Sequence, residues 1–559
     1  MSPRAGRALA IAALAVGAMV WAWSRAWVCD DAFITWRYAE NLGNGLGAVY
    51  NAGERVEGYS NPSWMLLAAL AIRLGLDPVA FGQWLGIVCY GALVPATAWA
   101  AQRFRPDGAA AAFLPLAAVG VALHRHLCDF ASCGLETLGF VLLVTLIAGV
   151  LARARSAGDF MTASVFTVLA AVTRPDGALV GALAGLVAVI ASVRQRSLGP
   201  VVGFALPGFL LFLPFLAWRW LYYDDLLPNT FYAKSAYDPY GSRGWFYVRL
   251  YLSAYYVLWP ALAAVLALPF VRGCGSVWRL AVLVSGYLAF VVWVGGDFMF
   301  ARFCLPVTPL CYIALEVAAR RFLPLRAGWG ALAVVAATTL VLHERADLCI
   351  PGRPLPEGIA DERAQYPPQR TAAIRAAGRR LGELTRGTDL RVAFSGTQAM
   401  LIYDAKVSYA LEAVTGLTDR FLARQELAVR GHVGHEKGIF SSDAAREYAL
   451  RSQGVHLLLF DWPQWTAKFP FLKVAMAGFD FTLVRWDREI MSRLIAAPDV
   501  AAVDLERYLD DYVAALPQRP RSDAAEVAID LAAFEFVYFR WHDDAARKQP
   551  IVRWLAEHR

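Results

Sequence analysis

The chain has 559 residues, of which 58% are hydrophobic and only 18% are charged, with a formal net charge of +7. Soluble globular proteins carry about 25% charged and about 45–50% apolar residues, so this composition excludes a water-soluble enzyme, a disordered chain and, with eight cysteines, a disulfide scaffold. The sequence shows no basic stripe with interleaved aromatic residues, so we expect no nucleic-acid partner. The composition instead predicts a polytopic α-helical membrane protein.

Apolar runs mark the expected transmembrane helices. The first run begins after Arg4 and Arg7 and ends in tryptophans rather than at a small-residue cleavage site, so we interpret it as a retained span with a cytoplasmic N-terminus. Further runs bring the expected number to about eleven, although several are shorter than the roughly 20 residues that a span needs. These further runs lie near 79–101, 109–123, 137–152, 160–173, 178–193, 200–221, 246–270, 280–295, 303–318 and 328–343.

Arginine placement predicts the orientation of these spans in a bacterial inner membrane. Lys and Arg are retained in cytoplasmic loops, and if the spans alternate, the arginine groups between them all fall on one side. These groups are Arg4/Arg7, Arg103/Arg105, Arg153/Arg155, Arg194/Arg196, Arg272/Arg279 and Arg320/Arg321/Arg326. The segment 62–78 is then interfacial or re-entrant, and the odd number of spans places the C-terminal residues outside the cytoplasm.

The composition changes near residue 344 to mixed charge with proline-rich punctuation. We therefore divide the chain into a transmembrane catalytic domain, 1–343, and an extracytoplasmic (periplasmic) domain, 344–559. The pattern of the second domain predicts a small α/β fold. It contains an apolar run at 390–394, helical stretches at 418–430 and 443–453, and the strand-like VHLLLF at 455–460.

The first outward loop, residues 29–64, begins with two adjacent carboxylates. Asp30 and Asp31 directly follow the first span at the membrane surface, where they are suited to binding or proton transfer. The aromatic residues after them predict an amphipathic helix lying on the interface. A structural alternative stays open, in which the two aspartates only cap that helix.

The second outward loop, residues 124–137, combines histidines, cysteines and carboxylates. Cys128 and Cys133 could form a disulfide in an oxidising compartment, but no spacing resembles a structural zinc site. The other polar residues of this loop are His124, His126, Asp129 and Glu136.

Three cations lie in the remaining outward loops, close to acidic residues. Arg174 lies in a turn with Asp176, Lys234 follows Asn229, and Arg302 follows Asp297. Arginine binds phosphate bidentately and lysine acts as a point charge, so we favour a site for an anionic lipid headgroup. The alternatives are an Arg174–Asp176 structural ion pair and aromatic-rich membrane anchoring.

A dense polar turn, Arg430-Gly-His432-Val-Gly-His435-Glu436-Lys437, lies in the C-terminal domain. Its glycines favour a loop over a metal site, and we interpret it either as a loop near acceptor or lipid or as an ordinary solvated turn.

Two nucleotide signatures are absent from the sequence. It has no G-x-x-x-x-G-K-[ST] loop for ATP and no Asp-x-Asp pair of the kind that holds a metal–nucleotide-sugar complex. Nucleotides are also scarce outside the cytoplasm. An enzyme on that face needs an activated group that is already in the membrane, and a polyprenyl-phosphate sugar meets this need.

Several motifs resemble the lipid-linked glycosyltransferases of the GT-C superfamily, and within it most closely the mycobacterial terminal β-(1→2)-arabinofuranosyltransferase family. The resemblance spans most of the chain as islands. It is carried by DDAFITWRYAENLGNGLGAVYNAGERVEGYSNPSW, SCGLET, TRPDG, DDLLPNTFYAK, GGDFMFARFCLP and the late GLTD…GHEK.

This resemblance implies decaprenyl-phosphate arabinofuranose as the donor and a cell-envelope glycan or surface glycoprotein as the acceptor. It implies catalytic carboxylates at Asp30 and Asp31, and a divalent cation held by either one stays open as a cofactor. Donor- or acceptor-binding candidates within the matching motifs are Arg37, Tyr38, Glu57, Tyr59, Asn61, Glu136, Arg174, Asp176, Asn229, Lys234, Asp297, Arg302, His432, His435, Glu436 and Lys437.

Two other functional classes are weighed against this one. A transferase of the same architecture could use a polyprenyl-linked hexose and act on protein. A transporter would place charges near the bilayer midplane and show repeated halves, whereas here the charges collect at span ends and no repeat is present.

Overall fold

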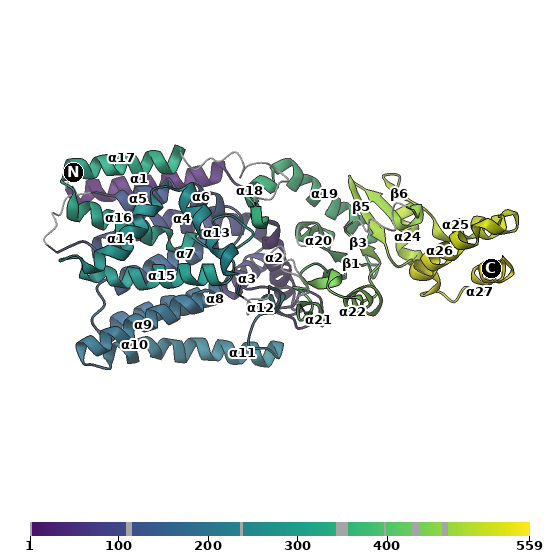
Figure 1. Ribbon diagram of the computed structural model, residues 1–559, viewed down its shortest axis with the longest axis horizontal. Coiled ribbons are helices and arrows are strands. Elements are labelled where there is room, and N and C mark those ends of the chain that lie inside the picture. Colours follow the sequence, from purple (N-terminus) through teal and green to yellow (C-terminus); the bar gives the residue numbers. More distant parts are fainter. Residues whose placement is uncertain are drawn as a thin grey trace. The chain divides into compact units, whose positions relative to one another are not determined.

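The computed structural model describes residues 3–107, 114–234, 239–341, 356–395, 398–426, 437–460 and 468–558. The chain divides into two compact units, coloured along the sequence in Figure 1. The first, here the helical unit, comprises Met1–Ala48 and Tyr59–Pro368. The second, here the sheet unit, comprises Val49–Gly58 and Gln369–Arg559.

The helical unit is built almost wholly from α-helices, which satisfy their own backbone polar groups and so suit a bilayer. Neighbouring helices such as α4 and α7, α7 and α8, and α8 and α9 pack side by side (Figure 1). The helices are α1 (Pro3–Ser24), α2 (Asp30–Gly43), α3 (Pro62–Arg73), α4 (Pro78–Arg103), α5 (Leu116–Ala122), α6 (Arg125–Ala131), α7 (Thr137–Leu151), α8 (Ala157–Thr173), α9 (Gly177–Gln195), α10 (Gly199–Pro207), α11 (Leu213–Tyr223), α12 (Asn229–Ala233), α13 (Gly241–Ala254), α14 (Leu258–Ala267), α15 (Trp278–Trp293), α16 (Thr308–Phe322), α17 (Leu325–Val341) and α18 (Glu362–Gln365).

Within the described residues, each apolar run of the sequence contains helix, but helix length does not establish eleven spans. Among the described residues, five helices are long and apolar enough to cross a membrane: Arg4–Ser24, Pro78–Arg103, Gly177–Gln195, Gly199–Tyr223 and Gly275–Trp293. A sixth span results if Gly241–Ala254 and Leu258–Phe270, which meet at 111°, act as one. Helices α7 and α16 have only 15 residues each, too few to cross a bilayer of ordinary thickness unless the bilayer thins around them.

Arginine groups from separate loops meet at one end of the helical unit. Arg103 Nε donates to the Gly149 carbonyl oxygen at 2.7 Å, and Arg153 Nε donates to the Arg103 carbonyl oxygen at 3.0 Å. Arg279 Nη1 donates to the Ala152 carbonyl oxygen at 3.1 Å. The folded helices therefore bring together cations that the sequence places in three different loops.

The opposite ends of the same helices carry the predicted site residues. Helix α7 begins directly after Glu136, α8 ends directly before Arg174, α9 begins directly after Asp176, and Asp297 follows the end of α15. The 19 residues of α9 separate Asp176 from the arginine-rich end by about 28 Å at the α-helical rise. Cationic loops and site residues thus lie at opposite ends of the helical unit.

Helix α2 corrects two expectations about the first loop. The predicted helix is present, but its stretch from Ala32 to Ala39 is buried on every face and packs against α3, so the helix does not lie with one face exposed. The capping alternative is wrong as well. Cys29 occupies the N-cap position without a side-chain cap bond, and Asp30 and Asp31 lie in the first helical turn.

The sheet unit contains a mixed six-stranded sheet in the order β2-β1-β3-β5-β4-β6. Strands β2, β1 and β3 are parallel, and the remaining pairs are antiparallel. The strands are β1 (Arg391–Phe394), β2 (Tyr409–Glu412), β3 (Leu457–Leu458), β4 (Lys473–Met476), β5 (Phe479–Leu483) and β6 (Val500–Ala502). The sheet and its helices confirm the α/β prediction for the C-terminal region.

The helices of the sheet unit are mostly short. The predicted helix at 418–430 is reduced to α21, where Asp419 accepts a capping bond from the Leu422 backbone N–H at 2.8 Å; residues 427–430 lie outside the described part. The helices are α19 (Pro368–Thr385), α20 (Ala399–Ala405), α21 (Arg420–Ala423), α22 (Asp443–Glu447), α24 (Arg488–Ile495), α25 (Leu505–Ala515), α26 (Ala524–Phe534) and α27 (Ala545–His558).

The tip of the first loop, Val49–Gly58, belongs to the sheet unit. The Asn51 side chain donates to the Ala410 carbonyl oxygen and accepts from the Ala410 backbone N–H, both at 3.0 Å. Because β2 is an edge strand, the Asn51 amide supplies the backbone partner that this edge otherwise lacks.

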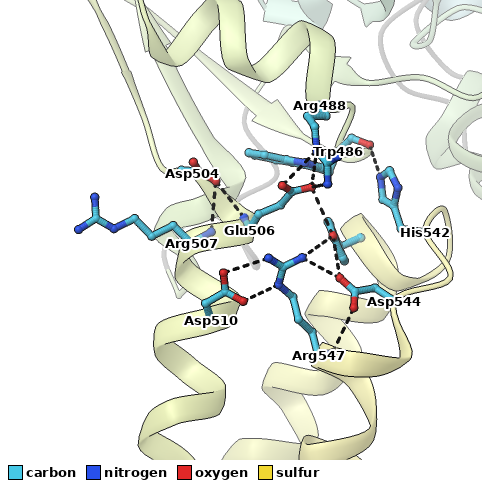
Figure 2. A network of polar contacts seen from close by, with 10 residues as sticks. Trp486, Arg488, Asp504, Glu506, Arg507, Asp510, His542, Asp544 and Arg547 are labelled. Carbon is cyan, nitrogen blue, oxygen red and sulfur yellow. Dashed lines mark hydrogen bonds and ion pairs between the residues drawn. The ribbon is translucent and has the colours of Figure 1, made fainter.

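A network of ion pairs joins helices α24, α25 and α27 (Figure 2). Arg547 on α27 donates to both carboxylate oxygens of Asp510 on α25, at 2.7 and 2.9 Å, and to Asp544 at 2.7 Å. Arg488 at the start of α24 binds Glu506 of α25 through two nitrogens, at 3.1 and 2.8 Å. Each of the two arginines thereby joins separate elements of the sheet unit.

Candidate active site

Glu136 lies at the centre of the polar cluster of the helical unit. It is 2% exposed, and its Oε2 accepts a hydrogen bond from Asn61 Nδ2 at 2.8 Å. Its Oε1 lies 3.4 Å from Arg302 Nη2 and 3.9 Å from Arg174 Nε. Thr35 of α2 donates to Asn61 Oδ1 at 3.1 Å. One carboxylate thus connects residues from the first, second, third and fifth outward loops.

Arg174 is held by one tight ion pair and two aromatic rings. Its Nε donates to Asp176 Oδ1 at 3.0 Å, so the structural ion pair that the sequence left open is present. The guanidinium carbon lies 5.1 Å from the ring centroid of Phe140 and 5.3 Å from that of Phe303. Tyr287 donates to the other oxygen of Asp176. Asp176 therefore orients Arg174 without accepting from its terminal nitrogens.

The turn after α15 carries Asp297 and Arg302 into the same cluster. Arg302 Nη1 lies 3.7 Å from Asp297 Oδ2, and the other carboxylate oxygen of Asp297 accepts from the Phe298 backbone N–H at 2.8 Å. Arg243 on α13 supports the turn, because its guanidinium donates to the carbonyl oxygens of Gly295 and Asp297. Gly295 has φ +86°, which glycine adopts without strain.

Asp30 and Asp31 meet this cluster from the first turn of α2. Asp30 is 1% exposed, whereas Asp31 is partly exposed. Burial raises the pKa of Asp31 above its ordinary value; Lys234 and Arg302 lower it in part, and the carboxylates of Asp297 and Glu136 raise it further. The Asp31 carboxyl group therefore lies within electrostatic range of cations and carboxylates from three other loops.

Among the described residues of the cluster, two buried guanidinium groups each have a nitrogen donor that makes no hydrogen bond. Within the described part of the chain, Arg174 Nη1 and Arg302 Nε have no hydrogen-bond partner, although the Arg174 side chain is 5% exposed and that of Arg302 11%. Burial lowers the pKa of Arg302, but the carboxylates of Asp297, Glu136 and Asp31 outweigh it and raise the pKa overall. Both guanidinium groups remain charged, with nitrogens available to an incoming anion.

The other candidates of the helical unit surround this cluster. Arg37 and Tyr38 lie in the buried stretch of α2, and Asn229 at the start of α12 is 4% exposed. The Tyr59 ring centroid lies 4.8 Å from that of Tyr38. The hydroxyl groups of Tyr59 and Tyr223 lie 2.9 Å apart.

The remaining candidates lie elsewhere. Glu57 and Lys437 are buried in the sheet unit, where Lys437 Nζ donates to the Ala423 carbonyl oxygen at 3.1 Å. His432, His435 and Glu436 lie outside the described residues.

The second outward loop forms core rather than a metal or disulfide site. Cys128 and Cys133 are both buried free thiols, so the disulfide that the spacing allowed is not formed. His124 Nε2 lies 2.9 Å from the Tyr251 hydroxyl, and His126 Nδ1 lies 2.5 Å from the Tyr255 hydroxyl. Among the residues that the structure describes, no group of three or more His, Cys, Asp or Glu side chains could hold a metal ion.

Sequence reasoning missed two residues of the cluster. Tyr287 lies within an apolar run. A buried tyrosine hydroxyl group needs a polar partner, and this requirement could have indicated that Tyr287 belongs to the cluster. Glu362 lies beyond the proline-rich segment that was assigned to the C-terminal domain, and burial followed by the charges of Asp31, Asp297 and Asp30 raises its pKa well above the ordinary value. No local pattern around Glu362 indicates this neighbourhood.

Comparisons with known proteins find glycosyltransferases similar to parts of the chain. No protein-family model matches it. It is 29% identical over 357 residues to a terminal β-(1→2)-arabinofuranosyltransferase of Corynebacterium glutamicum, covering 55% of this chain and 50% of the relative. It is 30% identical over 344 residues to the terminal β-(1→2)-arabinofuranosyltransferase of Mycobacterium tuberculosis, covering 53% of each protein. The chain thus spans about half the length of the curated relatives that it matches.

A solved structure shows the same fold. The apo crystal structure of ArnT from Cupriavidus metallidurans matches with a TM-score of 0.53 and 13% identity, covering 86% of this chain and 98% of ArnT. The match extends over both units, and at this identity it concerns the fold alone. The chain is a multi-pass membrane protein that shares its fold with ArnT, and its sequence is similar to those of terminal β-(1→2)-arabinofuranosyltransferases.

Proposed function

We propose that the chain is a membrane glycosyltransferase of the bacterial inner membrane that transfers an arabinofuranosyl residue from decaprenyl-phosphate arabinose. The acceptor is a cell-envelope glycan or a surface glycoprotein on the extracytoplasmic face. The observation that carries this proposal is the convergence of the Asp31 carboxyl group with Arg302 and Lys234 at one end of the helical unit, beside the unpartnered nitrogen of Arg174. A carboxylate next to several cations suits a reaction with a phosphate leaving group.

The arrangement supports the following reaction. The free nitrogens of Arg174 and Arg302, with Lys234, hold the lipid phosphate and neutralise the charge that grows as the bond from phosphate oxygen to anomeric carbon breaks. Asp30 or Asp31 accepts the proton of the acceptor hydroxyl group, whose oxygen forms the new bond to the anomeric carbon. Decaprenyl phosphate leaves with the electron pair of the broken bond. A raised pKa suits Asp31 to this role, because a carboxylate of ordinary pKa is a weaker base near neutral pH.

The orientation follows from charge. The arginine loops at the other end of the unit resist translocation, so we place them in the cytoplasm and the carboxylate cluster outside. In this orientation residues 1–343 form the catalytic transmembrane domain, residues 344–559 lie outside the cytoplasm, and the sheet unit holds the acceptor. Labelling of a single cysteine introduced at exposed Leu46, in a background without accessible cysteines, is expected with a membrane-impermeant reagent on intact cells. Labelling only after lysis would contradict the orientation.

The donor is tested directly. Membranes containing the full chain are incubated with synthetic decaprenyl-phosphate arabinose and an arabinan acceptor, and we expect transfer to exceed that of control membranes. The second candidate is a polyprenyl-phosphate hexose, which the charges of the cluster do not distinguish from the lipid-linked pentose. Competition between the two lipids identifies the donor, and preferential use of the hexose would replace the arabinose proposal. Absence of transfer from either lipid would contradict the glycosyltransferase proposal.

A further inference from the structure

A short segment after the last apolar helix is fastened to the site end of the helical unit. We call residues 357–366 the strap. Arg243 Nε donates to the first carbonyl oxygen of the strap at 2.9 Å, and the same arginine supports the Asp297 turn. Further along, Ala360 N donates to the Phe298 carbonyl oxygen, and Phe300 N donates to the Ala360 carbonyl oxygen, both at 2.8 Å. The strap therefore lies directly against the turn that carries Asp297.

The other end of the strap is fastened to the region between α1 and α2. Arg363 Nε donates to the Arg25 carbonyl oxygen at 3.1 Å and lies 3.6 Å from Asp129 Oδ1. Tyr366 stacks on Trp27, with ring centroids 6.4 Å apart and planes 20° from parallel. Anchors on both sides thus determine the position of Glu362, the first residue of α18.

Glu362 lies among the carboxylates of the site. It is 9% exposed. After burial, the charges that raise its pKa most are those of Asp31, Asp297 and Asp30, and Arg302 opposes them. These groups come from the first turn of α2 and from the turn after α15. The neighbours of Glu362 on the strap are Asp361 and Arg363, of which Arg363 is paired with Asp129.

The cluster combines carboxyl groups with cations. Asp30, Asp31, Asp297 and Glu362 supply carboxyl groups, whereas Arg174, Lys234 and Arg302 supply the cations, and Arg302 Nη1 lies 3.7 Å from Asp297 Oδ2. Phosphate oxygens bind guanidinium and ammonium groups, and carboxyl groups bind hydroxyl groups, which donate to them. A phosphate bound to the cations brings its sugar close to these carboxyl groups.

We propose that Glu362 is a further substrate-binding residue, whose carboxyl group hydrogen-bonds a hydroxyl group of the donor sugar while the arginines hold the phosphate. This inference rests on the proposed function, because it requires a sugar attached to a lipid phosphate. Glu362 contacts the sugar and not the phosphate, so its loss weakens binding of the complete donor and leaves binding of the bare lipid phosphate unchanged.

The test compares two lipids on the purified full chain in detergent. Glu362→Ala is expected to bind decaprenyl-phosphate arabinose about tenfold more weakly than the unmodified chain, the effect of losing one hydrogen bond, and to bind decaprenyl phosphate equally well. Glu362→Gln, which keeps the shape and the hydrogen-bonding capacity, is expected to lose less affinity than Glu362→Ala. In the transfer assay the KM for the donor is expected to rise more in Glu362→Ala than in Glu362→Gln.

Glu357→Ala is the matched control, because Glu357 is an exposed glutamate of the same strap whose backbone carbonyl oxygen, retained in alanine, accepts the bond from Arg243. It is expected to bind both lipids normally. The inference is wrong if Glu362→Ala matches this control, or if it loses affinity for both lipids equally. If the unmodified chain transfers sugar but Glu362→Ala has normal donor affinity, the proposed function stands without this residue. If the unmodified chain neither binds nor transfers a lipid-linked pentose, the proposed function is wrong and the inference falls with it.

Discussion

The arginines of the two units are used in contrasting ways. In the sheet unit, Arg547 approaches Asp510 and Asp544 at 2.7 to 2.9 Å, and its three nitrogens all donate (Figure 2). In the helical unit, Arg302 lies 3.4 Å from Glu136 and 3.7 Å from Asp297 and keeps its Nε unpartnered. All three nitrogens of Arg547 donate hydrogen bonds within the protein, whereas Arg302 is more deeply buried and has one nitrogen without a hydrogen-bond partner. A buried donor without a hydrogen-bond partner costs free energy. The comparison therefore indicates that the helical cluster is suited to binding a ligand.

Of the variants that test this contrast, substitution of Asp31 is expected to have the largest effect. Asp31→Asn keeps the shape of the side chain and removes the base, so transfer is expected to fall at least about a hundredfold, the usual contribution of general base catalysis. Asp30→Asn, assayed in parallel, shows whether the neighbouring carboxylate shares the role. The measurement is transfer from decaprenyl-phosphate arabinose in membranes with equal amounts of protein.

Asp107→Asn is the control for this pair, because Asp107 is exposed near the arginine-rich end of the same unit. It is expected to transfer normally. Near-normal transfer by both Asp30→Asn and Asp31→Asn would show that neither carboxylate is the base.

Arg302 tests whether the free donors bind phosphate. Arg302→Gln removes the charge and is expected to weaken binding of decaprenyl phosphate by roughly 10- to 100-fold, since hydrogen bonds to charged groups contribute about 1.5–3 kcal/mol. Arg302→Lys keeps the charge but not the bidentate geometry. Its affinity for decaprenyl phosphate is expected to lie between those of the unmodified chain and Arg302→Gln. Lipid binding to the purified chain in detergent is the measurement.

The matched substitution is Arg326→Gln, at an exposed arginine of the opposite end of the unit. Equal affinities of Arg302→Gln and Arg326→Gln for decaprenyl phosphate would refute a phosphate-binding role for Arg302.

Arg547 gives the smallest expected effect, on stability rather than activity. Its partners are partly exposed, so the network contributes about 1 kcal/mol, and Arg547→Gln is expected to lower the thermal unfolding midpoint of the sheet unit by about 3 °C. Transfer per folded molecule is expected to stay unchanged. Arg553→Gln, an exposed arginine on the same helix, is the comparison. A loss of transfer in Arg547→Gln without a lower midpoint would show that this network also serves the reaction.

Local chemistry made part of the site predictable. Asp30 and Asp31 directly follow an apolar run, and Arg174 and Asp176 are two residues apart, so adjacency alone indicated a carboxylate pair and an ion pair. The same adjacency misled for Cys128 and Cys133, which are close in sequence but remain free thiols. It also misled for α2, where an amphipathic pattern predicted a surface helix and the packing of α3 buries it.

Apolar runs by themselves determined where most helices of the membrane region form and located strands β1 and β3 of the C-terminal region, because the hydrophobic effect and backbone hydrogen bonding act over a few consecutive residues. Strands β2, β4, β5 and β6 were not predicted. The tertiary structure alone decided that Glu136 meets Arg302 across 166 positions, that the tip of the first loop joins an edge strand near residue 410, and that Glu362 comes within electrostatic range of Asp31. Such meetings depend on how whole helices pack, and no short-range pattern encodes them.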